Sequence, residues 1–133
     1  MITIAIVDNH PLMRQGLKDL FGRYDDFKVI LEAPNGYEFT QQLALLDSLP
    51  DVAIVDISMP VMDGFETTGF LKQHFPFVKI LAVSMYHDDR VISRMMQLGA
   101  SGYVTKTSDA HVFIEAVYAI VNNNAFVHNH INQ

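Results

Sequence analysis

The sequence predicts a doubly wound α/β domain with a five-stranded parallel sheet, in the strand order 2-1-3-4-5, and five helices. Five short apolar runs recur along the chain, and most are rich in Val and Ile and continuous rather than alternating, as expected for strands buried on both faces of a parallel sheet. Segments with helical spacing separate these runs. A chain of 133 residues, 50% of them hydrophobic, is long enough to bury one core. The apolar runs cover residues 3–7, 27–31, 52–55, 79–83 and 102–104.

The segments between the runs have apolar residues at intervals of three or four, which place them on one face of a helix. Phe39, Leu43 and Leu46 show this spacing, and later segments repeat it. Local signals mark the helix boundaries, because proline fits a first turn or stops a helix and Asn, Ser or Asp can cap its start. These signals are Pro11, Asn35 with Gly36, Pro76, and Ser108 or Asp109. The alternation of strand and helix with short loops favours right-handed crossovers.

The helical pattern stops near Asn122, and the segment after it is mostly polar. We expect residues 1–122 to form the domain. Residues 123–133 are expected to have no partner element and to be a tail or the start of a linker to an absent output domain. The apolar stretch at residues 1–7 is too short to span a membrane. We therefore expect a buried strand there and no membrane association.

Composition excludes several classes of function. Nine basic and fifteen acidic residues give a net charge of −6, which argues against direct nucleic-acid binding because Lys and Arg supply most of the affinity for phosphate backbones. The chain has no cysteine, so disulfides, thiolate metal sites and cysteine nucleophiles are ruled out. The absence of cysteine fits a cytoplasmic protein.

Polar and charged residues follow the expected strands. In open α/β sheets, ligands bind beyond the carboxyl ends of the strands, where the strand order reverses. The expected order makes the first and third strands neighbours, so that Asp8, Asn9 and Asp56 converge. The fourth and fifth strands bring Ser84 and Lys106 to the same rim.

This set of groups suits phosphoryl transfer. Two nearby carboxylates repel each other, and a hard cation such as Mg²⁺ relieves the repulsion while it keeps several waters. Lys106 can neutralise one oxygen of an incoming phosphoryl group, and Ser84 can donate a hydrogen bond to another. Asp56 is then the nucleophile that stores the group as an acyl phosphate.

Three motifs resemble the receiver domains of bacterial two-component response regulators, which have a flavodoxin-like fold, and the resemblance covers residues 1–122. They are the stretches 6–14 (Ile-Val-Asp-Asn-His-Pro-Leu-Met-Arg), 55–64 (Val-Asp-Ile-Ser-Met-Pro-Val-Met-Asp-Gly) and 99–106 (Gly-Ala-Ser-Gly-Tyr-Val-Thr-Lys). The resemblance implies that Asp56 is the phosphoacceptor and Lys106 the phosphate-binding lysine. It implies Mg²⁺ ligation by Asp8, Asn9, Asp56 and the backbone carbonyl of Ser58. Ser84 matches the switch hydroxyl, and Tyr103 matches the aromatic switch residue.

Two departures from the family pattern bear on function. Asn9 stands where the family usually has a carboxylate that touches the metal, so Mg²⁺ affinity should be weaker. Lys106 is followed by Thr107 rather than proline, which excludes a cis-proline there. This variation is similar to receivers attached to LuxR-type helix-turn-helix domains. The resemblance implies a sensor histidine kinase as partner, dimerisation on phosphorylation, transcription regulation, and DNA contact only through the absent output domain.

Alternative functions remain open on the sequence alone. The preferred hypothesis is a stoichiometric phosphoacceptor rather than an enzyme, with slow self-dephosphorylation. A degenerate receiver that acts as a phosphorylation-independent interaction module is the main alternative, because of Asn9. A phosphatase of the haloacid dehalogenase type would also use an aspartyl phosphate, but it needs a second aspartate where this chain has Ser58.

Overall fold

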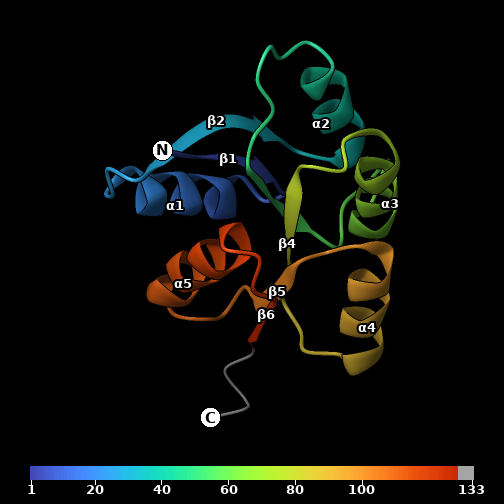
Figure 1. Ribbon diagram of the computed structural model, residues 1–133. Helices are drawn as coiled ribbons and strands as arrows, with labels where there is room; N and C mark the ends of the chain where they lie inside the picture. Colours follow the sequence, from blue (N-terminus) through green and yellow to red (C-terminus); the bar gives the residue numbers. More distant parts are fainter. Residues whose placement is uncertain (129–133) are drawn as a thin grey trace.

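The computed structural model describes residues 1–128 and shows a parallel sheet between two layers of helices (Figure 1). The strands are β1 (Ile2–Val7), β2 (Phe27–Ala33), β3 (Val52–Asp56), β4 (Lys79–Ser84), β5 (Gly102–Thr105) and β6 (Phe126–His128). The helices are α1 (Pro11–Gly22), α2 (Gly36–Leu43), α3 (Gly64–His74), α4 (Asp89–Leu98) and α5 (Ala110–Val121). The strand order is β2-β1-β3-β4-β5-β6. The predicted α/β fold and the predicted order of the first five strands are therefore confirmed.

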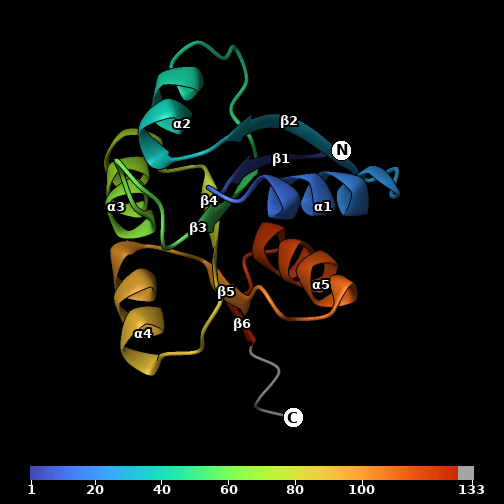
Figure 2. The same cartoon turned by 180° about the vertical axis from the view of Figure 1, so that it is seen from behind.

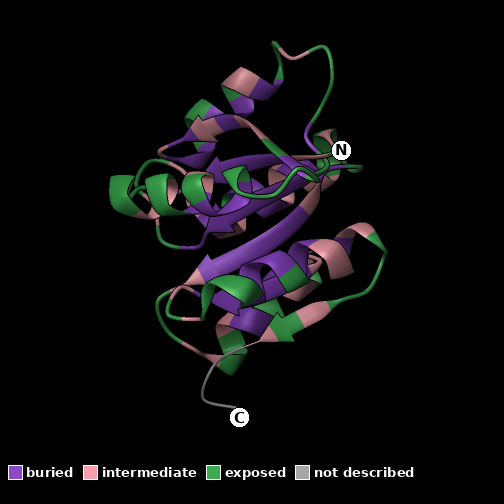
Figure 3. Cartoon of the chain, turned by 90° about the vertical axis from the view of Figure 1, so that its left-hand side faces the viewer, coloured by how far each residue is buried: buried purple, intermediate pink, exposed green. Residues whose placement is uncertain are grey.

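The sheet separates two cores. Helices α1 and α5 cover one face, while α2, α3 and α4 cover the other, as the view from behind also shows (Figure 2). In β1, Ile4 and Ile6 face the α1 and α5 side, whereas Ala5 and Val7 face the opposite side. Burial on both faces explains why the strands are continuous apolar runs. The strands are mostly buried, and exposed residues gather on the outer surfaces of the helices (Figure 3).

The helix boundaries follow the signals in the sequence. Pro11 is the first residue of α1, and the Asn35 side chain caps α2 by accepting a hydrogen bond from the Glu38 amide at 3.0 Å. Helix α3 ends at His74, two residues before Pro76. Asp109 lies at the cap position of α5 but makes no capping hydrogen bond with its side chain. Three of the four boundary signals thus act as expected. Asp109 marks the start of α5 without capping it through its side chain.

The strand β6 corrects the expectation that residues after 122 lack a partner element, and the sheet has six strands rather than five. Phe126 pairs with Gly102, and Val127 pairs with Tyr103. Without this pairing, one edge of β5 would expose unpaired backbone groups. Gly102 permits the close approach, because a Cβ atom at this position would lie 2.6 Å from the Phe126 carbonyl oxygen. The tail or linker was predicted for residues 123–133, of which residues 129–133 lie outside the described residues.

Within residues 1–128, none of the helices combines the length and the apolar character that crossing a membrane requires.

Candidate functional site

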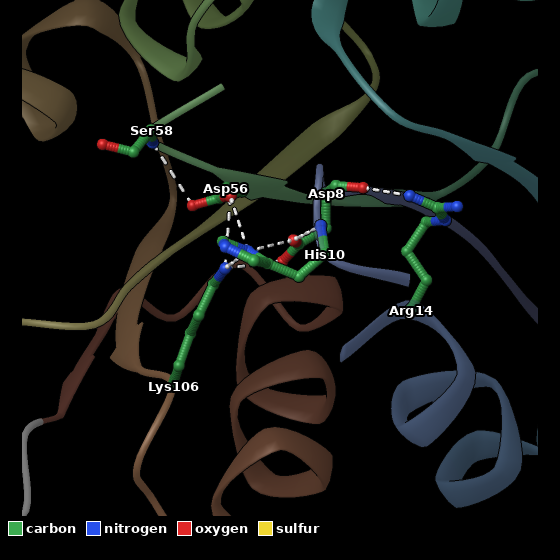
Figure 4. A network of polar contacts seen from close by, with 6 residues as sticks. All are labelled: Asp8, His10, Arg14, Asp56, Ser58 and Lys106. Atoms are coloured by element: carbon green, nitrogen blue, oxygen red, sulfur yellow. Dashed lines mark hydrogen bonds and ion pairs between the residues drawn. The ribbon is translucent and has the colours of Figure 1, made fainter. Parts of the chain in front are cut away.

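The carboxyl ends of β1, β3 and β5 bring two aspartates and a lysine together (Figure 4). Asp8 follows β1, Asp56 ends β3, and Lys106 follows β5. The Lys106 Nζ atom lies 2.9 Å from Asp8 Oδ2 and 3.1 Å from Asp56 Oδ2. Asp8 is 1% exposed and Asp56 is 2% exposed. The three charged groups that the sequence predicted to converge therefore meet in a buried cluster at the predicted edge of the sheet.

Backbone contacts fix the positions of these side chains. The Asp8 amide donates a hydrogen bond to the Ala33 carbonyl at 3.0 Å, which extends the pairing of β1 with β2. The Arg14 guanidinium donates to the Asp8 carbonyl at 2.6 Å from the first turns of α1. The Lys106 amide donates to the Ser84 carbonyl at 2.8 Å, which holds the lysine at the end of the β4 and β5 pair. The cluster is therefore built on the sheet rather than on free loops.

Burial dominates the electrostatics of Asp56. Loss of solvent raises the pKa of the Asp56 carboxyl, and the negative charge of Asp8 raises it further. The Lys106 ammonium and the Ser58 amide, whose nitrogen lies 3.2 Å from Asp56 Oδ1, oppose this rise. Burial and the charge of Asp8 therefore disfavour the ionised form of Asp56, and a further cation beside the carboxylate would stabilise that form.

Asp56→Asn is expected to stabilise the domain by about 1 kcal/mol at neutral pH, because it removes a buried charge beside Asp8. The folded-state pKa of Asp56 is raised, so the stability of the unsubstituted domain falls as pH rises through that pKa. The gain should therefore vanish in acid, where Asp56 is protonated in both states. Urea unfolding in a chelator, at a series of pH values, measures the difference in free energy of unfolding between the variant and the unsubstituted domain. A difference that is the same at every pH would contradict this account. Asp47→Asn, at an exposed loop position, is the control.

The structure adds His10 to the site, a residue to which the sequence assigned no role there. Its Nδ1 atom lies 3.1 Å from Asp8 Oδ1, 3.8 Å from Asp56 Oδ2 and 3.1 Å from Lys106 Nζ. The His10 amide donates to Asp8 Oδ1 at 2.8 Å, so a turn centred on Asp8 folds the histidine back over the carboxylates. A polar residue two positions after a strand-end aspartate is the signal that could have found it.

The remaining predicted residues lie around this cluster. Ser84 is the half-buried last residue of β4, and Asn9 is exposed. Tyr103 is fully buried in β5, and its hydroxyl donates a hydrogen bond to the Tyr86 carbonyl at 2.5 Å. Burial raises the pKa of the Tyr103 phenol, while hydrogen bonding with the Ser84 side chain lowers it. Tyr103 is thus coupled to the end of β4 and to the segment that follows it.

The donor set fits a hard divalent cation. Asp8 Oδ2 and Asp56 Oδ2 are both buried, and both lie within 3.1 Å of the Lys106 ammonium, which balances their negative charge in part. Carboxylate oxygens of this kind are the ligands that Mg²⁺ prefers. A metal ion bound at these oxygens would therefore share them with the Lys106 ammonium or displace it.

An acidic site at the carboxyl ends of a parallel sheet whose first five strands have the order β2-β1-β3-β4-β5, completed by a lysine, is the arrangement that the resemblance to receiver domains implied. The chain belongs to the response regulator receiver domain family, whose model matches residues 4–118. It is 35% identical over 127 residues to the transcriptional regulatory protein DegU of Brevibacillus brevis, a match that covers 96% of this chain and 53% of DegU. The chain spans about half the length of the curated relatives it matches.

Solved structures agree with this assignment. A LuxR-family two-component response regulator from Aurantimonas sp. SI85-9A1 has a TM-score of 0.86 and 30% identity, over 93% of this chain and 87% of that one. The isolated receiver domain of RcsB from Salmonella enterica serovar Typhimurium, determined with the phosphomimetic BeF₃⁻, has a TM-score of 0.86 and 25% identity, over 96% of this chain and 93% of that one. The chain is a two-component receiver domain related to the LuxR family of transcription regulators.

Proposed function

We propose that Asp56 accepts a phosphoryl group from a sensor histidine kinase and that this modification switches the surface of the domain. The observation that carries the proposal is the buried cluster in which Lys106 lies 2.9 Å from Asp8 and 3.1 Å from Asp56. An Asp56 carboxylate oxygen forms the new bond to phosphorus as the phosphorus–nitrogen bond of the kinase phosphohistidine breaks. The products are an acyl phosphate on Asp56 and a histidine that takes up a proton.

Each residue of the site has a separate part in this reaction. Asp8, Asn9, Asp56 and the Ser58 backbone carbonyl would hold Mg²⁺, which supplies charge neutralisation for the transferred group when it is bound. The Lys106 ammonium pairs with a phosphoryl oxygen, and the Ser84 hydroxyl donates a hydrogen bond to another. The burial of Asp56 limits the access of water to the acyl phosphate. The domain then acts as a stoichiometric phosphoacceptor with slow self-dephosphorylation rather than as a turnover enzyme.

The negative charge of the phosphoryl group on Asp56 drives the proposed switch. A phosphoryl group adds about −1.5 to −2 charges, which draws Ser84 and Lys106 toward Asp56. The Tyr103 hydroxyl donates a hydrogen bond to the Tyr86 carbonyl. Movement of the segment after β4 therefore changes how the Tyr103 ring packs. The face formed by α4, β5 and α5 then changes shape. We infer that this change promotes homodimerisation and acts on an output domain that regulates transcription in the bacterial cytoplasm, with residues 123–133 leading toward that domain.

The test is phosphorylation with acetyl phosphate and Mg²⁺ followed by intact mass spectrometry. The unsubstituted chain should gain the mass of one phosphoryl group, and Asp56→Ala should abolish the gain. Asp47→Ala, at an exposed loop position, should leave it unchanged. Labelling that survives Asp56→Ala would overturn the assignment of the phosphoacceptor. A complete absence of labelling would favour the phosphorylation-independent interaction module, which the amide at Asn9 also suggests.

Asn9→Asp is expected to strengthen Mg²⁺ binding roughly tenfold, because it restores a carboxylate where the chain has a neutral and exposed amide. Calorimetric titration with MgCl₂ measures the difference. Asn124→Asp, on an exposed residue near β6, controls for the added negative charge. Equal Mg²⁺ affinity in the chain with and without Asn9→Asp would show that position 9 does not face the metal.

A further inference from the structure

The strand β6 covers the edge of β5, the strand that carries Tyr103 (Figure 1). Its three residues pair with Gly102, Tyr103 and Val104, and Val127 is the partner of Tyr103. Partners in register have their side chains on the same face of a sheet. Val127 therefore lies beside Tyr103 on the face that α4 covers. The backbone of the proposed switch residue is thus held by β4 on one side and by β6 on the other.

The strand β6 is held less firmly than the rest of the sheet. Val127 is 54% exposed, and Phe126 is only partly buried against the α5 side of the core. The Phe126 amide donates to the Ser101 carbonyl at 3.3 Å, which is long for a backbone hydrogen bond. A short segment with few buried contacts opens more readily than a core strand. If β5 changes conformation, β6 is therefore the neighbour that gives way.

The turn between α5 and β6 is linked to the sheet by a side chain. Lys79 Nζ donates to Asn123 Oδ1 at 2.6 Å, which ties the turn to the start of β4. Asn123 has a left-handed backbone with φ of 64°, a conformation that glycine also adopts at no cost. A cavity of about 250 Å³ lies at this turn, and Met96 of α4 and Ala100 are among the residues that line it. The turn is therefore incompletely packed against the end of α4.

Tyr103 connects β6 to the phosphoacceptor. The Tyr103 hydroxyl donates to the Tyr86 carbonyl at 2.5 Å and also forms a hydrogen bond with the Ser84 side chain. A phosphoryl group on Asp56 would draw Ser84 away from this contact, so the Tyr103 side chain would have to take a new position. That movement would disturb the strand to which Val127 is paired. Phosphorylation of Asp56 and attachment of β6 thus favour different conformations of β5.

We propose that β6 is a releasable autoinhibitory strand, which holds β5 in its unphosphorylated conformation and detaches when Asp56 is phosphorylated. Coupling between two sites is reciprocal. The factor by which the modified site weakens β6 attachment is therefore the factor by which β6 weakens the modified state. Release of β6 would uncover the edge of β5 between α4 and α5, which flank it on opposite faces of the sheet (Figure 2). The inference rests on the proposed function, but it concerns a segment outside the phosphorylation site.

Beryllium fluoride, a phosphomimetic, tests this coupling at equilibrium. Hydrogen–deuterium exchange of the chain is followed by nuclear magnetic resonance in MgCl₂, with and without beryllium fluoride. Binding should accelerate amide exchange in residues 125–128 about fivefold or more and leave the buried Ile4 amide in β1 unchanged. If beryllium fluoride binds and exchange in residues 125–128 stays the same, the inference is overturned and the proposed function stands.

Two variants test the reverse direction through the Kd of beryllium fluoride. Phe126→Pro removes the amide that donates to the Ser101 carbonyl, and Asn123→Gly removes the Lys79 contact while it keeps the backbone conformation. Both should bind beryllium fluoride more tightly, Phe126→Pro by about fivefold or more. Val127→Thr, at an exposed position of β6, should bind like the unsubstituted chain.

The outcomes separate the inference from the proposed function. Asn123→Gly alters an exposed residue, so it decides the question if Phe126→Pro proves unstable. An unchanged Kd in the folded variants would contradict the reciprocal coupling. If beryllium fluoride does not bind and acetyl phosphate does not label the chain, the inference and the proposed function both fail.

Discussion

Lys106→Met is expected to destabilise the domain by about 3 kcal/mol at neutral pH in a chelator, because it leaves two buried carboxylates without their cation. The Lys106 side chain is 5% exposed and contacts both Asp8 and Asp56. Methionine keeps most of the length of the lysine stem, so loss of packing adds little. Urea unfolding measures the loss, and acetyl phosphate labelling of the variant should also fall sharply.

Two further conditions separate the charge effect from a packing effect. Lys106 lowers the pKa of Asp56, so the variant should have an even higher Asp56 pKa, and its stability loss should shrink as pH falls and the carboxyls take up protons. Asp8→Asn in the Lys106→Met background should restore part of the lost stability, since it removes the repulsion. A loss that persists unchanged in acid and in the double variant would show that the lysine acts through packing alone.

Gly64→Ala is expected to destabilise the domain by about 2–3 kcal/mol, because the added methyl group has no space. A Cβ atom on Gly64 would lie 2.6 Å from the Ile57 Cα atom and 2.7 Å from the Asp56 carbonyl oxygen. Both neighbours are backbone atoms, and the Gly64 amide also donates a hydrogen bond to the Ile57 carbonyl at 2.9 Å. The strand end that carries Asp56 must therefore shift, which should also slow phosphorylation.

Gly69→Ala is the matched control in the same helix. No atom lies within 4 Å of a Cβ at Gly69 beyond the helix itself, and Gly69 is inside α3. This substitution should stabilise the domain by about 0.5–1 kcal/mol, because alanine is the better helix former. Urea unfolding of both variants compares them directly. Equal stability of the two variants would show that the close approach of α3 to the end of β3 is not the reason for glycine at position 64.

The sequence predicted the central part of the site because the carboxyl ends of all strands in a parallel sheet lie at the same edge. Continuous apolar runs identified the strands, and their order placed the residue after each run at one edge. Asp8, Asp56 and Lys106 meet there, as that reasoning requires. The roles given to Ser58 and Tyr103 came from family resemblance, whereas Ser84 was placed at the rim by the strand order, and all three roles stay predictions.

The sixth strand and the position of His10 could not be predicted in this way. Residues 126–128 are too few to show a periodic pattern, and they form a strand because β5 offers an open edge and Gly102 allows close approach. The ring of His10 is placed by a turn around the Asp8 carboxylate, which depends on where that carboxylate points.

The sequence by itself determined the fold class, the edge of the sheet that carries the chemistry and the residue that accepts phosphate in our proposal. These features depend on apolar periodicity and on chain order, both of which are local or topological. Only the tertiary structure decided that Lys106 lies between the two aspartates, that His10 completes a cluster with them, and that β6 closes one edge of the sheet. Those features depend on distances between side chains and backbone atoms from separate strands, and such distances arise only when the core is packed.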